Sequence, residues 1–222
     1  AVIAENITNA DKILDATNKL CLPGGIEAHC HIEQESGMGI MAADDYKSGS
    51  ISAVYGGNTT IVPFAAQHRG QSLREVVKIY HERARPKSVI DYAFHLIISD
   101  ATEQVLGQEL PALIKDGYTS FKVFLTYPLL KLSDADFLNV LSVAREHGAL
   151  TMVHAENDDV INWLTDRLLA NGNTAPKFHA ISHARVAETE ASNRAIQLAR
   201  LIDTPLFIVH VSTNEAASVI RK

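Results

Sequence analysis

The chain has 222 residues, of which 46% are hydrophobic and 21% charged, a composition typical of ordinary globular proteins. A chain of this length can bury one sizeable core. Its net charge of −6 comes without any cluster of lysines and arginines. This argues against nucleic acid as a partner, because phosphate contacts need concentrated positive charge.

The sequence also bears on location. No apolar run approaches the roughly 20 residues needed to cross a bilayer, and the N-terminal segment shows no secretory pattern. Cys21 and Cys30 are the only cysteines, too few for a disulfide framework. We therefore expect a reduced, cytoplasmic setting and no membrane partner.

Apolar segments of strand length alternate with segments of helical periodicity along the chain. The predicted strands cover residues 19–32, 59–64, 89–98, 119–125, 150–154 and 205–211. The predicted helices cover residues 44–55, 73–83, 103–115, 134–147, 158–170, 185–201 and 214–222. Acidic pairs at 44–45 and 158–159 fit helix starts, where the helix dipole favours negative charge.

Six successive βα units predict a parallel sheet flanked by helices. Both a doubly wound open sheet and a (β/α)8 TIM-type barrel satisfy this alternation. A barrel commonly uses about 250 residues and eight units, so the chain is about two units short of one. Residues 1–20 read as the remnant of a small N-terminal β domain, with 1–3 and 12–16 as candidate edge strands, and residues 21–222 as the partial barrel.

The sharpest local signal is His29-Cys30-His31, at the end of the first predicted strand. Alternate side chains of a strand share one face and lie about 6.6 Å apart along it. Two imidazoles placed in this way can converge on one ion at the usual Zn–N distance of about 2.0–2.1 Å. The alternative is a pair of partly buried histidines without a ligand.

Two further histidines end apolar strands. His154 follows residues 150–153, and His210 lies within the apolar run 207–211. The carboxyl ends of parallel strands are where such folds place their active sites. Each histidine alone is more often a satisfied core residue, but four at strand ends favour a shared site.

Lys122 lies in the apolar run 120–125, on the strand face opposite Phe121, Val123 and Leu125. A buried ammonium is costly unless it is paired or neutralised. Three interpretations stay open: a lysine that reaches a water-filled mouth, a Schiff-base lysine with a depressed pKa, or a lysine that reacts with carbon dioxide to form a carbamate bridging two metal ions. The nearby histidines favour the carbamate, because an ammonium would repel the cations they bind.

The order of these motifs resembles that of the amidohydrolase superfamily, and within it the hydantoinase and dihydropyrimidinase family. The similar segments are 15–26, His29-Cys30-His31, 56–60, Phe121-Lys122-Val123-Phe124, Val153-His154-Ala155-Glu156-Asn157, 179–194 and Val209-His210-Val211-Ser212. The resemblance thus extends over nearly the whole chain, and it implies a (β/α)8 barrel with a centre of two zinc ions or other divalent metals.

The resemblance also implies roles. His29 and His31 would hold the more buried ion, His154 and His210 the more exposed one, and Lys122, as N6-carboxylysine, would bridge them. Tyr127 matches a family tyrosine that binds the substrate carbonyl and stabilises the developing oxyanion; its alternative role is packing on Pro128. The implied activity is hydrolysis of a small cyclic amide, by ring opening of a hydantoin or dihydropyrimidine, in a homo-oligomer that family resemblance makes a tetramer.

The family pattern is incomplete here. An aspartate at the end of the eighth strand ligates metal and shuttles a proton in the family, and the chain stops after the sixth predicted strand. Asp203 follows a helix and precedes Pro205, so it is no substitute. We expect the chain to be an internal piece of a protein about twice as long, or a truncated relative completed by another chain, and to have low or no turnover alone.

Two glutamates depart from the family pattern. Glu27 stands where an aspartate is common before the paired histidines, a change we interpret as tolerated. Glu33 stands where dihydroorotases carry an arginine for the substrate carboxylate. Because a glutamate would repel that carboxylate, dihydroorotase activity is disfavoured and neutral ring substrates are favoured. A dihydroorotase or allantoinase-type cyclic amidase remains a lesser alternative.

Two other functions remain as alternatives. A non-catalytic dihydropyrimidinase-related scaffold would bind no stoichiometric zinc, and an aldolase would form a Schiff base on Lys122. The remaining histidines are interpreted as structural, with two of them also able to line the site. They are His68, His81, His95 and His147, and, between the fifth and sixth strands, His179 and His183.

Overall fold

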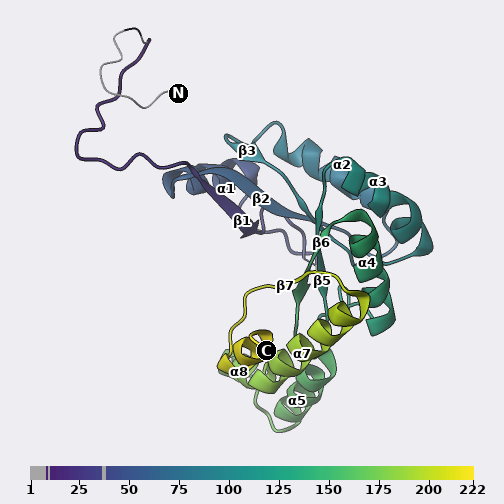
Figure 1. Ribbon diagram of the computed structural model, residues 1–222. Coiled ribbons are helices and arrows are strands. Elements are labelled where there is room, and N and C mark those ends of the chain that lie inside the picture. The colour runs from purple at the N-terminus through teal and green to yellow at the C-terminus, as the bar shows by residue number, and fades with distance from the viewer. Residues whose placement is uncertain (1–8, 10, 37–38) are drawn as a thin grey trace.

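The computed structural model describes residues 9, 11–36 and 39–222 (Figure 1). The strands are β1 Gly25–Cys30, β2 Asn58–Ala66, β3 Asp91–Tyr92, β4 His95–Ile97, β5 Ser120–Phe124, β6 Leu150–His154 and β7 Leu206–Ile208. The α-helices are α1 Tyr46–Tyr55, α2 Leu73–Ala84, α3 Leu110–Lys115, α4 Asp134–His147, α5 Asp158–Ala170, α6 His179–Ser182, α7 Arg185–Ile202 and α8 Asn214–Ile220. A π-helical turn, Val105–Glu109, precedes α3, and a 3-10 turn, Pro176–Phe178, precedes α6.

The strands form one parallel sheet in the order β1-β2-β4-β5-β6-β7, with β3 paired to β2. In a flat sheet, the two edge strands of this order would lie about 24 Å apart. Instead, the ring centroids of His29, on β1, and His210, just after β7, are 5.5 Å apart. The sheet therefore curls until its first and last strands face one another, as part of a (β/α)8-type barrel.

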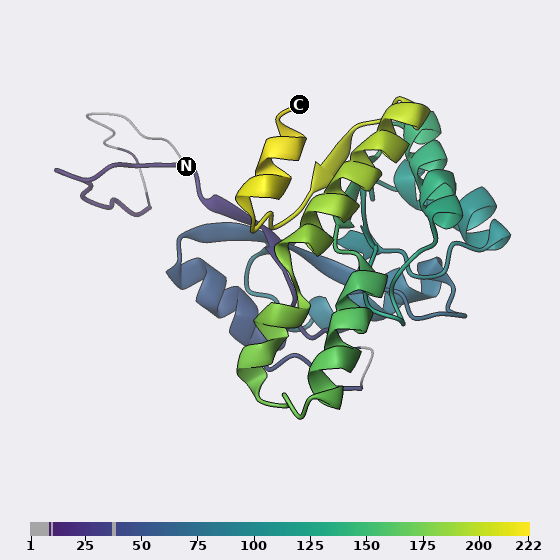
Figure 2. The ribbon, with the colours of Figure 1, turned by 90° about the horizontal axis from the view of Figure 1, so that it is seen from below.

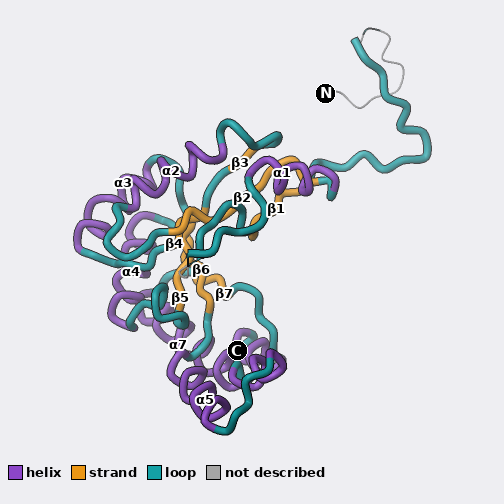
Figure 3. Tube along the Cα trace, turned by 180° about the vertical axis from the view of Figure 1, so that it is seen from behind, coloured by secondary structure: helices purple, strands orange, loops and turns teal. Residues whose placement is uncertain are grey.

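The helices lie outside the curled strands (Figures 2 and 3). Apolar strand residues such as Phe121 and Val153 are fully buried, and so are Phe137 and Leu141 of α4, on the facing side. Burial of large apolar side chains contributes about 1.5–3 kcal/mol each. This packing fixes the strand ends in space, and with them the residues that follow.

The acidic pairs do begin helices, as predicted. Asp45 caps α1 by accepting hydrogen bonds from the backbone N–H groups of Lys47 and Ser48. Asp158 and Asp159 lie in the first turn of α5. None of the described helices is both long enough and apolar enough to cross a membrane.

Four predicted elements differ clearly from those observed. The strand predicted at 205–211 covers only Leu206–Ile208, so His210 follows this strand and does not lie in it. The first strand starts at Gly25 instead of residue 19, and residues 11–24 extend outward, exposed and without a strand partner, so 12–16 is no edge strand; residues 1–3 lie outside the described part of the chain. Strand 89–98 is interrupted at Ala93 and Phe94 into β3 and β4, without a change of register on β2. The helix at 103–115 widens into a π-turn just before Pro111, which lacks the N–H group that an α-helical bond needs.

Candidate metal centre at the strand ends

The predicted site residues come from four strands, at or near their carboxyl ends. His29 lies in β1 and His31 follows its end, Lys122 lies in β5, His154 ends β6, and His210 follows β7. Parallel strands present their carboxyl ends at one edge of the sheet, so the curl of the sheet brings these positions together.

The four histidines form a connected group. The ring centroids are 5.8 Å apart for His29 and His31, 5.5 Å for His29 and His210, and 4.6 Å for His154 and His210. Two imidazoles on one tetrahedral ion would have centroids about 5 Å apart, given Zn–N bonds of about 2.0–2.1 Å. The observed separations are therefore close to those of imidazoles that share an ion. Among the described residues, however, no group of three or more His, Cys, Asp or Glu side chains has ion-binding geometry.

Lys122 lies between the two histidine pairs. Its Nζ is 5.0 Å from the ring centroids of both Phe64 and Phe124. The Phe64 ring packs on His29 and His31, and the Phe124 ring on His154. The lysine is 1% exposed, and its Nζ has no hydrogen-bond or ion-pair partner among the described residues. Burial lowers the pKa of Lys122 to about 8, which makes the neutral amine accessible.

Hydrogen bonds fix which ring nitrogen of two histidines is free. Nδ1 of His31 donates to Oε1 of Gln34 at 2.8 Å, which leaves Nε2 with a lone pair. Nε2 of His154 donates to Oε2 of Glu156 at 2.7 Å, which leaves Nδ1 with one. A hydrogen bond on one ring nitrogen orients the other toward a ligand. Each of these two rings therefore has one nitrogen whose lone pair is free to bind a metal ion.

Two histidines of the group are held neutral. Burial, followed by the charge of Lys122 and of neighbouring histidines, lowers the pKa of His29 to about 4. Burial, followed by His154, lowers the pKa of His210 to about 4. Metal ligation requires neutral imidazole, so this environment favours the ligand form over the protonated one.

Tyr127 lies beside the second histidine pair. Its ring centroid is 5.2 Å from that of His154 and 6.0 Å from that of Phe124. The residue is 40% exposed and has φ of 69°, in the left-handed region. Burial, with Glu156 second, raises the pKa of the Tyr127 phenol, which keeps its hydroxyl a hydrogen-bond donor at neutral pH.

The carboxylate of Glu33 has partners that the sequence did not predict. Oε1 of Glu33 pairs with Nζ of Lys87 at 2.6 Å, Oε2 accepts from the backbone N–H of Tyr46, and the Glu33 carbonyl accepts from Arg83. Its charge is thus neutralised on the α1–α2 side, so the predicted repulsion of a substrate carboxylate loses its basis. Glu27, by contrast, has a plain local role, since its Oε1 accepts from the backbone N–H of His29 at 2.9 Å.

The remaining histidines divide into satisfied residues and residues near the site. Both ring nitrogens of His95 are used, by Ser120 Oγ at 2.6 Å and the Ala28 carbonyl at 3.0 Å. His81 is similarly held by the hydroxyls of two tyrosines, Tyr92 and Tyr118. These two are structural, as predicted.

Other contacts escaped sequence reasoning. His183 donates from Nδ1 to Oε1 of Glu156 at 2.9 Å, which ties it indirectly to His154. His154 holds the pKa of Glu156 at about 2 through its hydrogen bond, so this carboxylate stays ionised. The position of Glu156, two residues beyond a strand-end histidine, was the available signal. Nothing in the sequence pattern marked Phe64 or Gln34.

A curled parallel sheet with imidazoles and one buried lysine at its strand ends defines the class: a (β/α)8-type barrel protein with its polar site where such barrels carry out chemistry. The D-hydantoinase of Geobacillus stearothermophilus is 43% identical over 223 residues, 99% of this chain and 47% of that protein. The dihydropyrimidinase of Dictyostelium discoideum is 39% identical over 99% of this chain and 44% of its own length. Over nearly its whole length the chain therefore resembles members of the hydantoinase and dihydropyrimidinase family.

The solved structures agree. The crystal structure of dihydropyrimidinase from Brevibacillus agri superposes with a TM-score of 0.93 at 43% identity, covering 98% of this chain and 47% of that one. No model of a known protein family matches the chain. The chain spans less than half the length of the relatives named here.

Proposed function

We propose that this chain supplies the metal-binding part of a hydrolase that opens cyclic amides such as hydantoins and dihydropyrimidines. The observation that carries the proposal is the meeting of His29, His31, Lys122, His154 and His210 at the strand ends. The names of the relatives, D-hydantoinase and dihydropyrimidinase, support the substrate class.

The donor set fits two divalent ions, zinc being the expected metal. His29 and His31 would hold one ion, His154 and His210 the other, and Lys122 would bridge the two as a carboxylated lysine. Neutral imidazoles suit zinc, and the two histidine pairs have centroid separations close to those of one-ion ligand pairs. When bound, the ions would supply Lewis-acid polarisation of the amide carbonyl and a hydroxide at neutral pH.

The carbamate follows from the state of Lys122. With a pKa of about 8, part of the lysine population is the neutral amine at neutral pH. The nitrogen lone pair attacks the carbon of carbon dioxide, a new N–C bond forms, and one N–H proton leaves to water. A buried, costly cation thereby becomes an anion with two oxygen donors, which suits a site built to hold positive charge.

Tyr127 would act on the substrate. Its protonated hydroxyl, beside His154, is available to donate to the carbonyl oxygen of the ring amide. That hydrogen bond gains strength as negative charge develops on the oxygen, which is how oxyanion donors accelerate acyl chemistry.

The substrate, the assembly and the cellular location belong to the same proposal. The partner would be a small cyclic amide, with no nucleic acid or membrane involved, in a homo-oligomer that family resemblance makes a tetramer. A cytoplasmic location is supported by Cys21 and Cys30, which are both free thiols.

Metal analysis of the purified chain, loaded with zinc in bicarbonate buffer, tests this proposal. We expect two zinc ions per chain and, by native mass spectrometry of the intact zinc-loaded chain, a gain in mass equal to one carbon dioxide, which we assign to Lys122. Hydantoin or dihydrouracil should further raise the melting temperature of the zinc-loaded chain, since a ligand that binds the folded state stabilises it. Absence of stoichiometric zinc would favour the scaffold alternative. Borohydride trapping of a carbonyl compound on Lys122 would favour the aldolase.

A further inference from the structure

A glutamate acts on each of the two histidines from the last strands, directly on the His154 ring and indirectly, through Ser212, on the turn of His210. Glu156 accepts from Nε2 of His154 at 2.7 Å and from Nδ1 of His183 at 2.9 Å. The His154 ring is therefore fixed in one tautomer and one orientation, by a carboxylate that is itself anchored to a second ring. Carboxylate–histidine pairs of this kind orient ligands in metal sites.

His210 is held through its backbone instead. It follows the short strand β7 and has φ of 38°, a left-handed conformation that is unfavourable for a residue with a side chain. Oε1 of Glu188, on α7, accepts from the backbone N–H of Ser212 at 2.7 Å, and Oγ of Ser212 donates to the His210 carbonyl at 3.1 Å. These bonds close the turn around His210 and offset its strain.

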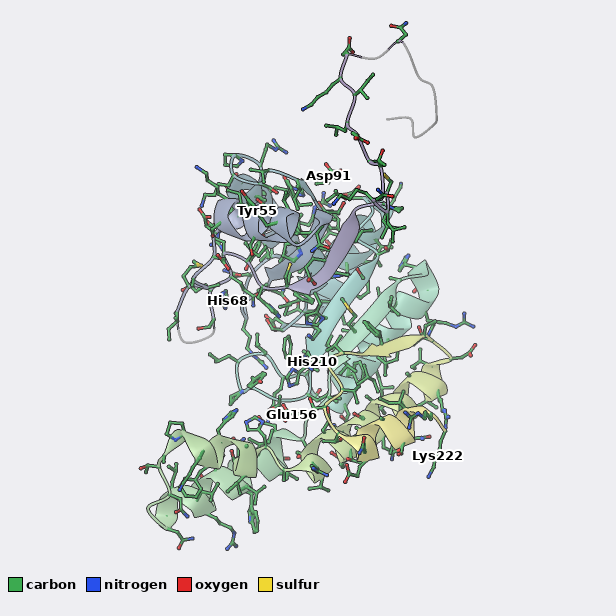
Figure 4. All side chains as sticks on the ribbon, turned by 90° about the vertical axis from the view of Figure 1, so that its left-hand side faces the viewer. Tyr55, His68, Asp91, Glu156, His210 and Lys222 are labelled. Atoms are coloured by element: carbon green, nitrogen blue, oxygen red, sulfur yellow. The ribbon has the colours of Figure 1, made fainter. Side chains whose placement is uncertain are left out.

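The two glutamates share one cavity with the histidines. The cavity has a volume of about 320 Å³, and His154, Glu156, His183, Glu188 and His210 are among its lining residues. In Figure 4, Glu156 and His210 lie close together between the strand ends and the C-terminal helices. Oε2 of Glu188 is buried and lacks a hydrogen-bond partner among the described residues. A buried carboxylate oxygen without a partner is costly, and a cation bound nearby would reduce that cost.

We propose that Glu156 and Glu188 are positioning residues, which fix the ring of His154 and the turn of His210 so that both histidines meet one ion. The proposal rests on the proposed function, in which these two histidines hold the second ion. It assigns Nδ1 of His154 as the ligand atom, since Nε2 is engaged by Glu156. Neither glutamate need contact the ion itself.

The test uses the 222-residue chain titrated with Co²⁺ alone, whose visible absorption reports ligand geometry, and with Zn²⁺ in competition with a chelator. The variants are Glu156→Ala, Glu188→Ala and Glu188→Gln, with Glu215→Ala as control. Glu215 lies on α8 and pairs only with exposed Arg185, at 3.5 Å. Melting temperatures of the metal-free variants report on folding separately.

We expect each alanine variant to bind its second ion about 10- to 100-fold more weakly, the range typical of groups that orient metal ligands, with the first ion unchanged. The cobalt spectrum of the second ion should change as well. Glu188→Gln should recover most of the affinity, because its amide oxygen can still accept from the N–H of Ser212. Glu215→Ala should match the wild type.

Other results would overturn the inference. If the wild type binds two ions and Glu156→Ala and Glu188→Ala bind both equally well, the glutamates do not position the histidines, while the proposed function stands. Equal weakening of both ions, with a lower melting temperature and no recovery by Glu188→Gln, would show a merely structural role. A wild-type chain that binds no Co²⁺ or Zn²⁺ would overturn the proposed function together with the inference.

Discussion

The two histidine pairs at the strand ends reach similar geometry by different means. His29 and His31 come from one strand, lie on one phenylalanine ring, Phe64, and are fixed by close sequence neighbours. Glu27 holds the His29 backbone and Gln34 holds the His31 ring, over separations of two and three residues.

The second pair depends on distant parts of the chain. His154 and His210 come from different strands, and Glu156 is anchored by His183, 27 residues away. Glu188 reaches Ser212 across 24 residues. The first pair is therefore encoded locally, whereas the second exists only when β6, β7 and α7 are packed together. We expect the first ion position to tolerate distant changes and the second to be sensitive to them.

The largest loss of zinc should follow a change at Lys122, the residue that would bridge both ions. Lys122→Met keeps a long side chain of similar shape between Phe64 and Phe124 but cannot form a carbamate. We expect zinc at both positions to be lost at micromolar protein, with the fold retained or stabilised because a buried amine is removed. Zinc content and melting temperature measure the two effects.

The matched control for this change is Lys115→Met, since Lys115 is exposed at the end of α3. It should leave zinc content unchanged. Two zinc ions retained by Lys122→Met would contradict the bridging role of the lysine.

Single histidine changes should separate the pairs. His31→Ala should remove the first ion and His210→Ala the second, so that each leaves about one zinc per chain, because each ion loses one of two imidazole ligands. His147→Ala, at the exposed end of α4, is the control. Loss of both ions in both variants would mean that the two histidine pairs form one cooperative centre and do not bind their ions independently.

Much of this arrangement could be predicted from sequence, because its signals are local. Periodicity gave the βα alternation, and an isolated lysine in an apolar strand marked Lys122. The direction of the Glu33 side chain was not predictable, since its partner Lys87 lies 54 residues away. The positive φ of Tyr127 and His210 likewise arises from tertiary packing, which periodicity does not report.

A smaller effect is expected at Gln34. Gln34→Ala removes the acceptor that orients the His31 ring, and we expect about tenfold weaker zinc binding at the first position, the low end for such contacts. The second position should be unaffected. Chelator competition measures both affinities. Weaker binding confined to the second ion would show that Gln34 does not orient a ligand of the first.

The smallest effect on zinc binding should follow the loss of the ion pair between Glu33 and Lys87. Lys87→Met removes a partly exposed ion pair, and such pairs contribute little in water. We expect a slightly lower urea midpoint and a smaller loss of zinc affinity than in Gln34→Ala. Lys78→Met, which breaks the exposed pair with Glu75, serves as the comparison. If Lys87→Met weakens zinc binding at His29 and His31 more than Gln34→Ala does, the ion pair of Glu33 and Lys87, and not Gln34, positions His31.

A crystal structure of the chain grown with zinc and bicarbonate, with anomalous data at the zinc edge, tests most directly whether the four histidines and Lys122 form one metal centre. We expect two zinc peaks, one at His29 and His31 and one at His154 and His210. We also expect electron density from Nζ of Lys122 that extends into a carboxylate touching both ions. An unmodified Lys122, with no zinc at either histidine pair, would show that these residues do not form a metal centre.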